Sequence, residues 1–288
     1  MIPKNIISVV FCLLARNCVG NLQRNISFIE KYRKQFNRSI VIIVENDSID
    51  GTKEILEKWG LESEGIIVQN QNHPEWETMD RITRIAHCRN EYMNILRLQN
   101  TIYDFVIIID MDLELCNIDF MKVIDKAPSD FSALFANGRY YKSFLNYRIP
   151  VFYYDLYAYI PFNSSIIEFK KKEIRDNGDA LEKRLRKEKY VPCDSAFGGL
   201  AIYRTEAIQN LFYAIVPNHR SDYYSVLCEH IPFNLNCKKQ GSLYIVKDMH
   251  LFYEPLTWEQ IMRRYLCRFE SKRCFSILYK LYCIFKKP

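Results

Sequence analysis

The sequence predicts an α/β protein in which a mostly parallel, Rossmann-like sheet is flanked by helices. Two apolar runs, residues 40–44 and 105–109, are rich in β-branched side chains and lack polar alternation. Such runs are typical of strands that are buried on both faces of a parallel sheet. Segments with helical spacing separate the apolar runs, and this strand–helix alternation is the pattern of a doubly wound sheet with right-handed crossovers.

The expected elements can be placed in chain order. Strands are expected at residues 6–14, 39–44, 65–69, 105–109, 200–203 and 242–246. Helices are expected at residues 21–36, 53–59, 80–98 and 206–212, with Gly60 as a C-terminal stop and Thr205 as an N-cap. Residues 170–189 are dense in charge and are expected to form a solvated, mobile excursion. No G-x-G-x-x-G follows the first strand and no G-x-x-x-x-G-K-[ST] occurs, so the dinucleotide fingerprint and the standard P-loop are absent.

A pair of acids closes the apolar run at 105–109. Asp110 and Asp112 are two residues apart, so in an extended segment their side chains point the same way. Open α/β sheets bind ligands outside the carboxyl ends of their strands, and paired carboxylates suit a divalent cation. The alternative is an ordinary acidic turn after a strand. The position of the pair at the end of a fully buried strand favours a metal–diphosphate site.

Composition bears on compartment and partners. The chain has 288 residues, is 49% hydrophobic and carries a net charge of +6. Its ten cysteines form no C-x-x-C pair, which indicates a reducing compartment without a disulfide framework, and we expect a cytoplasmic protein. The apolar residues 6–15 resemble a signal peptide, but no small-x-small cleavage site follows and a first buried strand is the preferred interpretation.

The C-terminal segment differs from the rest of the chain. We divide the chain into a main α/β domain at residues 1–255 and a helical, aromatic and basic tail at 256–288. From Arg263 onward the tail holds eight Lys or Arg residues against one acid, Glu270. This mixture predicts an amphipathic helix that binds an anionic membrane surface, with the protein peripheral on the inner face of the membrane. The alternative is a C-terminal helix packed on the core. No motif supports binding to nucleic acid.

Several motifs together carry a resemblance to a known family. They are E-N-D-S-x-D-G-T at residues 45–52, R-x-x-R-I-A-x-x-R-N at 81–90, D-x-D at 110–112, G-G-x-x-x-Y-R at 198–204 and C-E-H at 228–230. In this order the chain resembles nucleotide-sugar glycosyltransferases of the GT-A fold, and most closely the fungal capsule-associated alpha-1,3-mannosyltransferase-like group.

The resemblance implies a donor site. Asp110 and Asp112 would hold Mn²⁺ or Mg²⁺ against the donor diphosphate, which fits the preference of hard cations for oxygen ligands. The base and ribose would lie near four residues: Ala15, Arg16, Glu45 and Asn46. Arg84 and Arg89 lie on one expected helix and would reach the phosphates. Both UDP- and GDP-linked sugars remain open as donors.

The resemblance also implies an acceptor side. Glu229 would act as the general base in an inverting reaction, or would orient the acceptor in a retaining one. His250 follows the last expected strand and would complete the metal shell. Tyrosines in residues 131–159 belong mainly to the core, and a few would contact acceptor sugars. The predicted function is therefore metal-dependent transfer of a hexose to a hydroxyl of a glycan or lipid-linked glycan. A nucleotidyltransferase acting on sugar phosphates and a non-catalytic glycan-binding domain are the alternatives.

Overall fold

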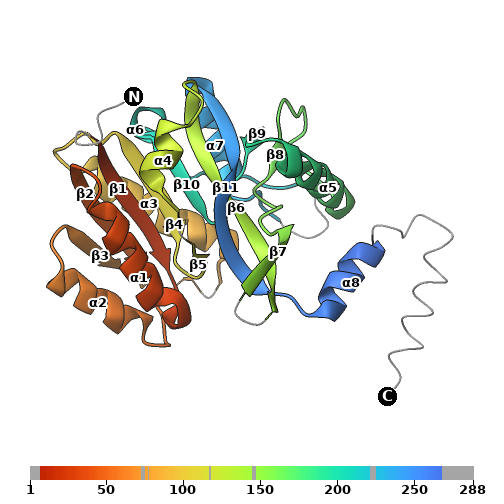
Figure 1. Cartoon of the computed structure of the whole chain (residues 1–288). Helices are drawn as coiled ribbons and strands as arrows, with labels where there is room; N and C mark the ends of the chain where they lie inside the picture. Colours follow the sequence, from red (N-terminus) through yellow and green to blue (C-terminus); the bar gives the residue numbers. More distant parts are fainter. Residues whose placement is uncertain are drawn as a thin grey trace, which may run out of the picture.

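The computed structural model describes residues 7–72, 75–76, 78–116, 118–144, 147–220 and 225–267. These residues form an 11-stranded sheet with the order β3-β2-β1-β4-β10-β6-β11-β9-β8, in which β5 pairs with β11 and β7 with β6 (Figure 1). The strands are β1 (Ser8–Ala15), β2 (Arg38–Glu45), β3 (Ile66–Asn70), β4 (Phe105–Asp110), β5 (Glu114–Leu115), β6 (Phe131–Phe144), β7 (Tyr147–Tyr153), β8 (Ile160–Pro161), β9 (Tyr190–Ser195), β10 (Leu200–Arg204) and β11 (Ser242–Pro255).

Helices cover both faces of the sheet. They are α1 (Val19–Arg33), α2 (Thr52–Glu62), α3 (Arg81–Arg97), α4 (Phe120–Asp125), α5 (Lys171–Lys187), α6 (Thr205–Ile208), α7 (His230–Cys237), the 3₁₀ turn η1 (Lys238–Gln240) and α8 (Trp258–Cys267). Alternate residues of β1 enter two different cores: Val10 packs with α3, whereas Val9 and Phe11 pack with α1 and α2. This two-sided burial explains why the strand carries apolar residues without alternation.

The two halves of the sheet are built differently. β3, β2, β1 and β4 are parallel neighbours joined by helices. β10 then runs antiparallel to both β4 and β6, and β11 runs parallel to β6. The predicted α/β fold with a mostly parallel central sheet flanked by helices is confirmed, and the antiparallel strands lie in the second half.

Four local predictions are wrong. Gly60 lies inside α2 rather than ending it, where a Cβ atom would meet Val68 Cγ2 at 2.9 Å, so the glycine permits close packing on β3. Residues 170–189 are largely the helix α5, because Gly178, Leu181 and Leu185 form a buried stripe at helical spacing. Thr205 is the first residue of α6 and its buried hydroxyl has no partner in the described part of the chain. The last strand does not end at residue 246: β11 continues to Pro255, with an irregular register between Ile245 and His250.

Candidate active site

The carboxyl end of β4 is fixed from both sides. The Asp110 backbone N–H donates to the Gly199 carbonyl at 3.1 Å, and the Met111 N–H donates to the Leu14 carbonyl at 2.9 Å. The buried Asn25 amide of α1 donates to the Met111 and Leu113 carbonyls at 3.0 and 2.7 Å. These bonds satisfy the turn's backbone groups and hold the segment that carries both aspartates.

Glycines allow another loop to approach this end of the sheet. Gly198 and Gly199 have φ of 67° and 87°, a region that favours glycine. A Cβ at Gly198 would lie 2.2 Å from the Ala136 carbonyl oxygen, and one at Gly138 would lie 2.3 Å from the Gly198 oxygen. No side chain fits there, so the backbone of the 198–199 turn packs directly on β6.

A cavity of about 210 Å³ lies beside the two aspartates, between β1 and α3, and we call it the donor-side pocket. It is lined by Leu14, Arg16, Asn17, Asn46, Arg81, Arg84, Ile85, Cys88, Asp110 and Asp112. The structure thus brings together five residues that the sequence predicted for the donor: Arg16, Asn46, Arg84, Asp110 and Asp112. Arginines and amides facing paired acids give a wall that can bind both a cation and an anion.

Two predicted donor residues lie behind this wall. Ala15 is buried, and its carbonyl accepts from the Asn46 N–H at 3.0 Å. Glu45 is also buried, and its carboxylate accepts from the Ser48 N–H at 2.7 Å, which closes the turn after β2. Both residues therefore support the loop that presents Asn46, and neither lines the pocket.

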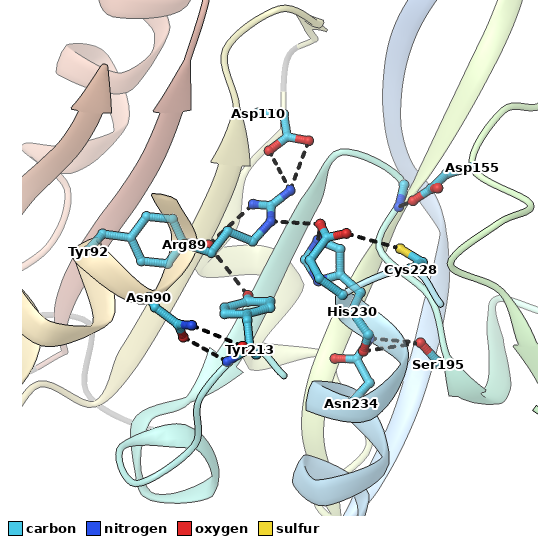
Figure 2. A network of polar contacts seen from close by, with 12 residues as sticks. Arg89, Asn90, Tyr92, Asp110, Asp155, Ser195, Tyr213, Cys228, His230 and Asn234 are labelled. Atoms are coloured by element: carbon cyan, nitrogen blue, oxygen red, sulfur yellow. Dashed lines mark hydrogen bonds and ion pairs between the residues drawn. The ribbon is translucent and has the colours of Figure 1, made fainter. Parts of the chain in front are cut away.

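Arg89 is the centre of a buried network (Figure 2). Its Nη2 donates to the two Asp110 carboxylate oxygens at 2.9 and 3.2 Å, and its Nε donates to Glu229 Oε1 at 2.9 Å. Nη1 donates to the Tyr92 hydroxyl at 3.2 Å. The guanidinium carbon lies 4.9 Å from the Phe197 ring centroid, and the side chain is 2% exposed. The donors of Arg89 are thus used within the protein, whereas the sequence interpretation assigned them to phosphates.

Burial shifts the pKa values of two titratable side chains in this network. Burial raises the pKa of Asp110 to about 7, although the Arg89 guanidinium acts in the opposite direction. Burial, aided by Arg89, holds the pKa of His230 well below its usual range, so this imidazole is neutral. His230 stacks on Phe197 with 3.9 Å between ring centroids, and neither ring nitrogen has a hydrogen-bond partner in the described part of the chain.

A second cavity of about 430 Å³ lies on the other side of Asp110, between α3 and α7, and we call it the acceptor-side pocket. Its lining includes Glu229, His230, Tyr154, Tyr157 and Asp155. Asp110, Arg81 and Ile85 line both cavities, so the two pockets share a wall.

Several residues of the acceptor-side pocket were missed as site candidates. Asp155 accepts from the Gly198 N–H at 2.9 Å, and burial raises its pKa to about 6. Arg81 was not assigned a role in the site, yet it lines both pockets. His230 was quoted only as part of the C-E-H motif. The R-x-x-R spacing of Arg81 and Arg84, which places both on one helix face, was the available signal for Arg81.

The structure places His250 away from the two pockets around Asp110. It lines a third cavity, in which Asn137 is its neighbour with 3.5 Å between Asn137 Nδ2 and His250 Nδ1. That cavity shares no lining residue with the two pockets around Asp110. In the described ranges no three His, Cys, Asp or Glu side chains form a group that could hold a metal ion. The structure therefore does not bring His250 to the two aspartates.

The remaining pair of acids still fits a divalent cation. Asp110 and Asp112 line one small pocket and offer carboxylate oxygens, the ligands that Mg²⁺ and Mn²⁺ accept, while other positions are commonly filled by phosphates and water. Burial disfavours the ionised form of Asp110, and the ion pair with Arg89 opposes this effect. A further positive charge in the pocket would stabilise its ionised form.

Comparison with known proteins gives a family and several similar structures. The family model described as "Cryptococcal mannosyltransferase 1" matches residues 13–242. GalNAc-T7 with UDP, GalNAc and Mn²⁺ has a TM-score of 0.52 at 14% identity, over 88% of this chain and 44% of that one. PcManGT from Pyrobaculum calidifontis in complex with GDP-Man and Mn²⁺ scores 0.48 at 14% identity, over 90% and 60% of the two chains. TarS 1-349 of S. aureus scores 0.47 at 14% identity, over 91% and 64%.

This chain therefore spans less than two-thirds of each of these three structures. A search of curated proteins gave no match. Within the residues that the structure describes, no helix has the length and apolarity needed to cross a bilayer.

Proposed function

Because the chain belongs to the Cryptococcal mannosyltransferase 1 family and is a glycosyltransferase of the GT-A fold, we propose that it transfers a hexose from a nucleotide-diphosphate sugar to a hydroxyl of a glycan or lipid-linked glycan. The observation that carries the proposal is the shared wall at Asp110, with a basic, acid-containing pocket on one side and Glu229 on the other. The family sets aside the nucleotidyltransferase and the non-catalytic alternatives.

The donor binds in the donor-side pocket. Asp110 and Asp112 would hold Mn²⁺ or Mg²⁺, which supplies charge neutralisation for the departing diphosphate. Arg84 is half-buried and lines this pocket, and its Nε has no hydrogen-bond partner among the described residues, so we assign its guanidinium to a phosphate oxygen. Arg16 and Asn46 line the donor-side pocket and not the acceptor-side pocket, and they would contact the nucleoside.

The acceptor binds in the acceptor-side pocket, where Glu229 is the candidate base. In an inverting reaction the acceptor oxygen forms the new bond to the anomeric carbon while the bond to the diphosphate breaks, and Glu229 takes the hydroxyl proton. Arg89 positions this carboxylate, since its Nε–Oε1 contact is 2.9 Å. In a retaining reaction Glu229 only orients the acceptor.

Calorimetry with GDP and with UDP, each with Mn²⁺, tests the donor site and identifies its base. A turnover assay then tests transfer, beginning with GDP-mannose because the family description names a mannosyltransferase, and NMR of the product gives its anomeric configuration. Failure of both nucleotides to bind in the presence of Mn²⁺ would contradict the proposal. The predicted cytoplasmic location stays a prediction. The membrane contact of the tail also stays a prediction, because residues 268–288 lie outside the described ranges.

A further inference from the structure

One face of the β6–β7 hairpin carries exposed apolar side chains. Phe144 pairs with Tyr147, and Lys142 pairs with Ile149. Residues two apart along a strand, and residues paired across strands, lie on one face, so all four side chains share a face of the hairpin. Phe144, Tyr147 and Ile149 are 62%, 73% and 50% exposed. Three large hydrophobic residues together on a hairpin end favour a binding surface.

Helix α8 extends this surface. Ile261 is buried against the body of the protein, and the Tyr265 ring lies 5.2 Å from the Phe152 ring of β7. Trp258 and Met262 are 66% and 48% exposed on the same helix. Figure 1 shows α8 near β7 and away from α1 and α2. We call the exposed residues Lys142, Phe144, Tyr147, Ile149, Trp258 and Met262 the hairpin–α8 surface.

A basic cavity opens beside these residues. It has a volume of about 610 Å³, and Lys142, Ile149 and Trp258 line it. Its charged lining residues are four cations and one acid: Arg139, Lys142, Arg186, Lys247 and Glu182.

The single acid of this cavity is already neutralised. Arg139 Nη1 and Nη2 donate to the two Glu182 oxygens at 2.9 and 3.0 Å. Lys142 Nζ lies 5.5 Å from the Trp258 ring centroid, so a cation and the exposed indole stand together at the border of the cavity. The remaining positive charge favours an anionic group in the cavity.

We propose that the hairpin–α8 surface docks on an anionic membrane, with a lipid phosphate in the basic cavity and the apolar side chains in the interfacial layer. Aromatic and aliphatic side chains beside Lys and Arg are the composition that binds such interfaces. The exposed aliphatic residues Ile149 and Met262 favour a membrane over a soluble acidic glycan, which has no apolar layer to receive them. The chain continues after Cys267 with six more Lys or Arg residues among residues 268–288, so positive charge follows this surface directly.

The test is binding of the full chain to phosphatidylcholine vesicles with and without phosphatidylglycerol. We expect binding only to the anionic vesicles, with a blue shift of tryptophan fluorescence. Trp258 would report it, since Trp59 and Trp76 are only 6% and 7% exposed. Lys142→Glu and, separately, Ile149→Ser should each weaken vesicle binding about tenfold, because each removes part of the interfacial attraction.

Matched controls lie on α2, away from this surface. Lys58→Glu makes the same charge change, and Leu61→Ser, at a residue that is 89% exposed, makes a comparable apolar change. Both should bind vesicles like the unaltered protein. Equal binding of Lys142→Glu, Ile149→Ser and the controls would overturn the proposal. So would binding of soluble dextran sulfate without vesicle binding. The assay needs no donor sugar, so its outcome is independent of the proposed transfer reaction.

Discussion

The donor-side and acceptor-side pockets are built from different parts of the chain. Every residue lining the donor-side pocket lies between positions 14 and 112, in the parallel half of the sheet. The acceptor-side pocket takes one wall from α3 and β4 and the other from residues 154–230. The donor-side pocket is thus formed by neighbouring βα units. The acceptor-side pocket is complete only when segments that are distant in the sequence meet. We infer that variants in the two walls should separate donor binding from acceptor chemistry.

The largest expected effect comes from the cation site. Asp112→Asn should reduce turnover on the order of a thousandfold, because charge neutralisation of the leaving group supplies several kcal/mol and each 1.36 kcal/mol is tenfold in rate. Asp112 is exposed and is not paired with Arg89, so the melting temperature should not change. Asp248→Asn, at an exposed residue of β11, is the control. Full turnover of Asp112→Asn, or in excess chelator, would remove the metal role.

The next largest effect is expected on the free energy of unfolding. It tests the Arg89 ion pairs that connect the two halves of the sheet. Arg89→Met leaves two carboxylates without their buried cation, which typically costs about 3–5 kcal/mol of unfolding free energy. Urea denaturation measures this loss. Arg24→Met, which breaks an ion pair to Glu114 at a 44% exposed arginine, should cost about 1 kcal/mol or less. Similar losses for both variants would show that the Arg89 network does not join the halves.

Glu229→Gln tests the acceptor wall alone. It should reduce kcat roughly a hundredfold, the lower end of the contribution of a general base. Nucleotide affinity measured by calorimetry should stay unchanged, because Glu229 does not line the donor-side pocket. Glu206→Gln, at an exposed residue beyond β10, serves as control. Wild-type turnover of Glu229→Gln would exclude it from the chemistry, and a loss of nucleotide affinity would contradict the separation of the walls.

The smallest effect should come from Arg84→Met on the donor wall. Loss of one charge-assisted contact to a phosphate should weaken nucleotide binding about tenfold, within the range of a hydrogen bond to a charged group. The free energy of unfolding should change little, since Arg84 forms no ion pair within the described part of the chain. Arg24→Met is again the comparison. Unchanged nucleotide affinity would mean that the phosphates bind elsewhere.

The same contrast explains what the sequence could predict. In the first half, uninterrupted apolar runs such as 105–109 identified the strands, and the two acids after that run indicated the residues that line the donor-side pocket, because both signals are local. The sequence favoured Arg89 over Arg84 for the phosphates, because it does not show that the partners of Arg89 include Glu229, 140 residues away. The helix α5 was missed because its charged surface outweighed a narrow stripe of Gly178, Leu181 and Leu185. His250 was misplaced because the irregular register of β11 is not visible in the sequence.

The close packing at Gly138, Gly198 and Gly199 limits how this enzyme can be engineered. A Cβ at Gly199 would lie 1.9 Å from Leu113 Cδ1, and one at Gly198 or Gly138 would lie 2.2 or 2.3 Å from a backbone oxygen. Libraries that seek new acceptors should therefore hold these three positions constant. Diversity belongs at Val226, which borders the acceptor-side pocket, whereas Tyr157 is held by the hydrogen bond that its hydroxyl donates to the Val226 carbonyl.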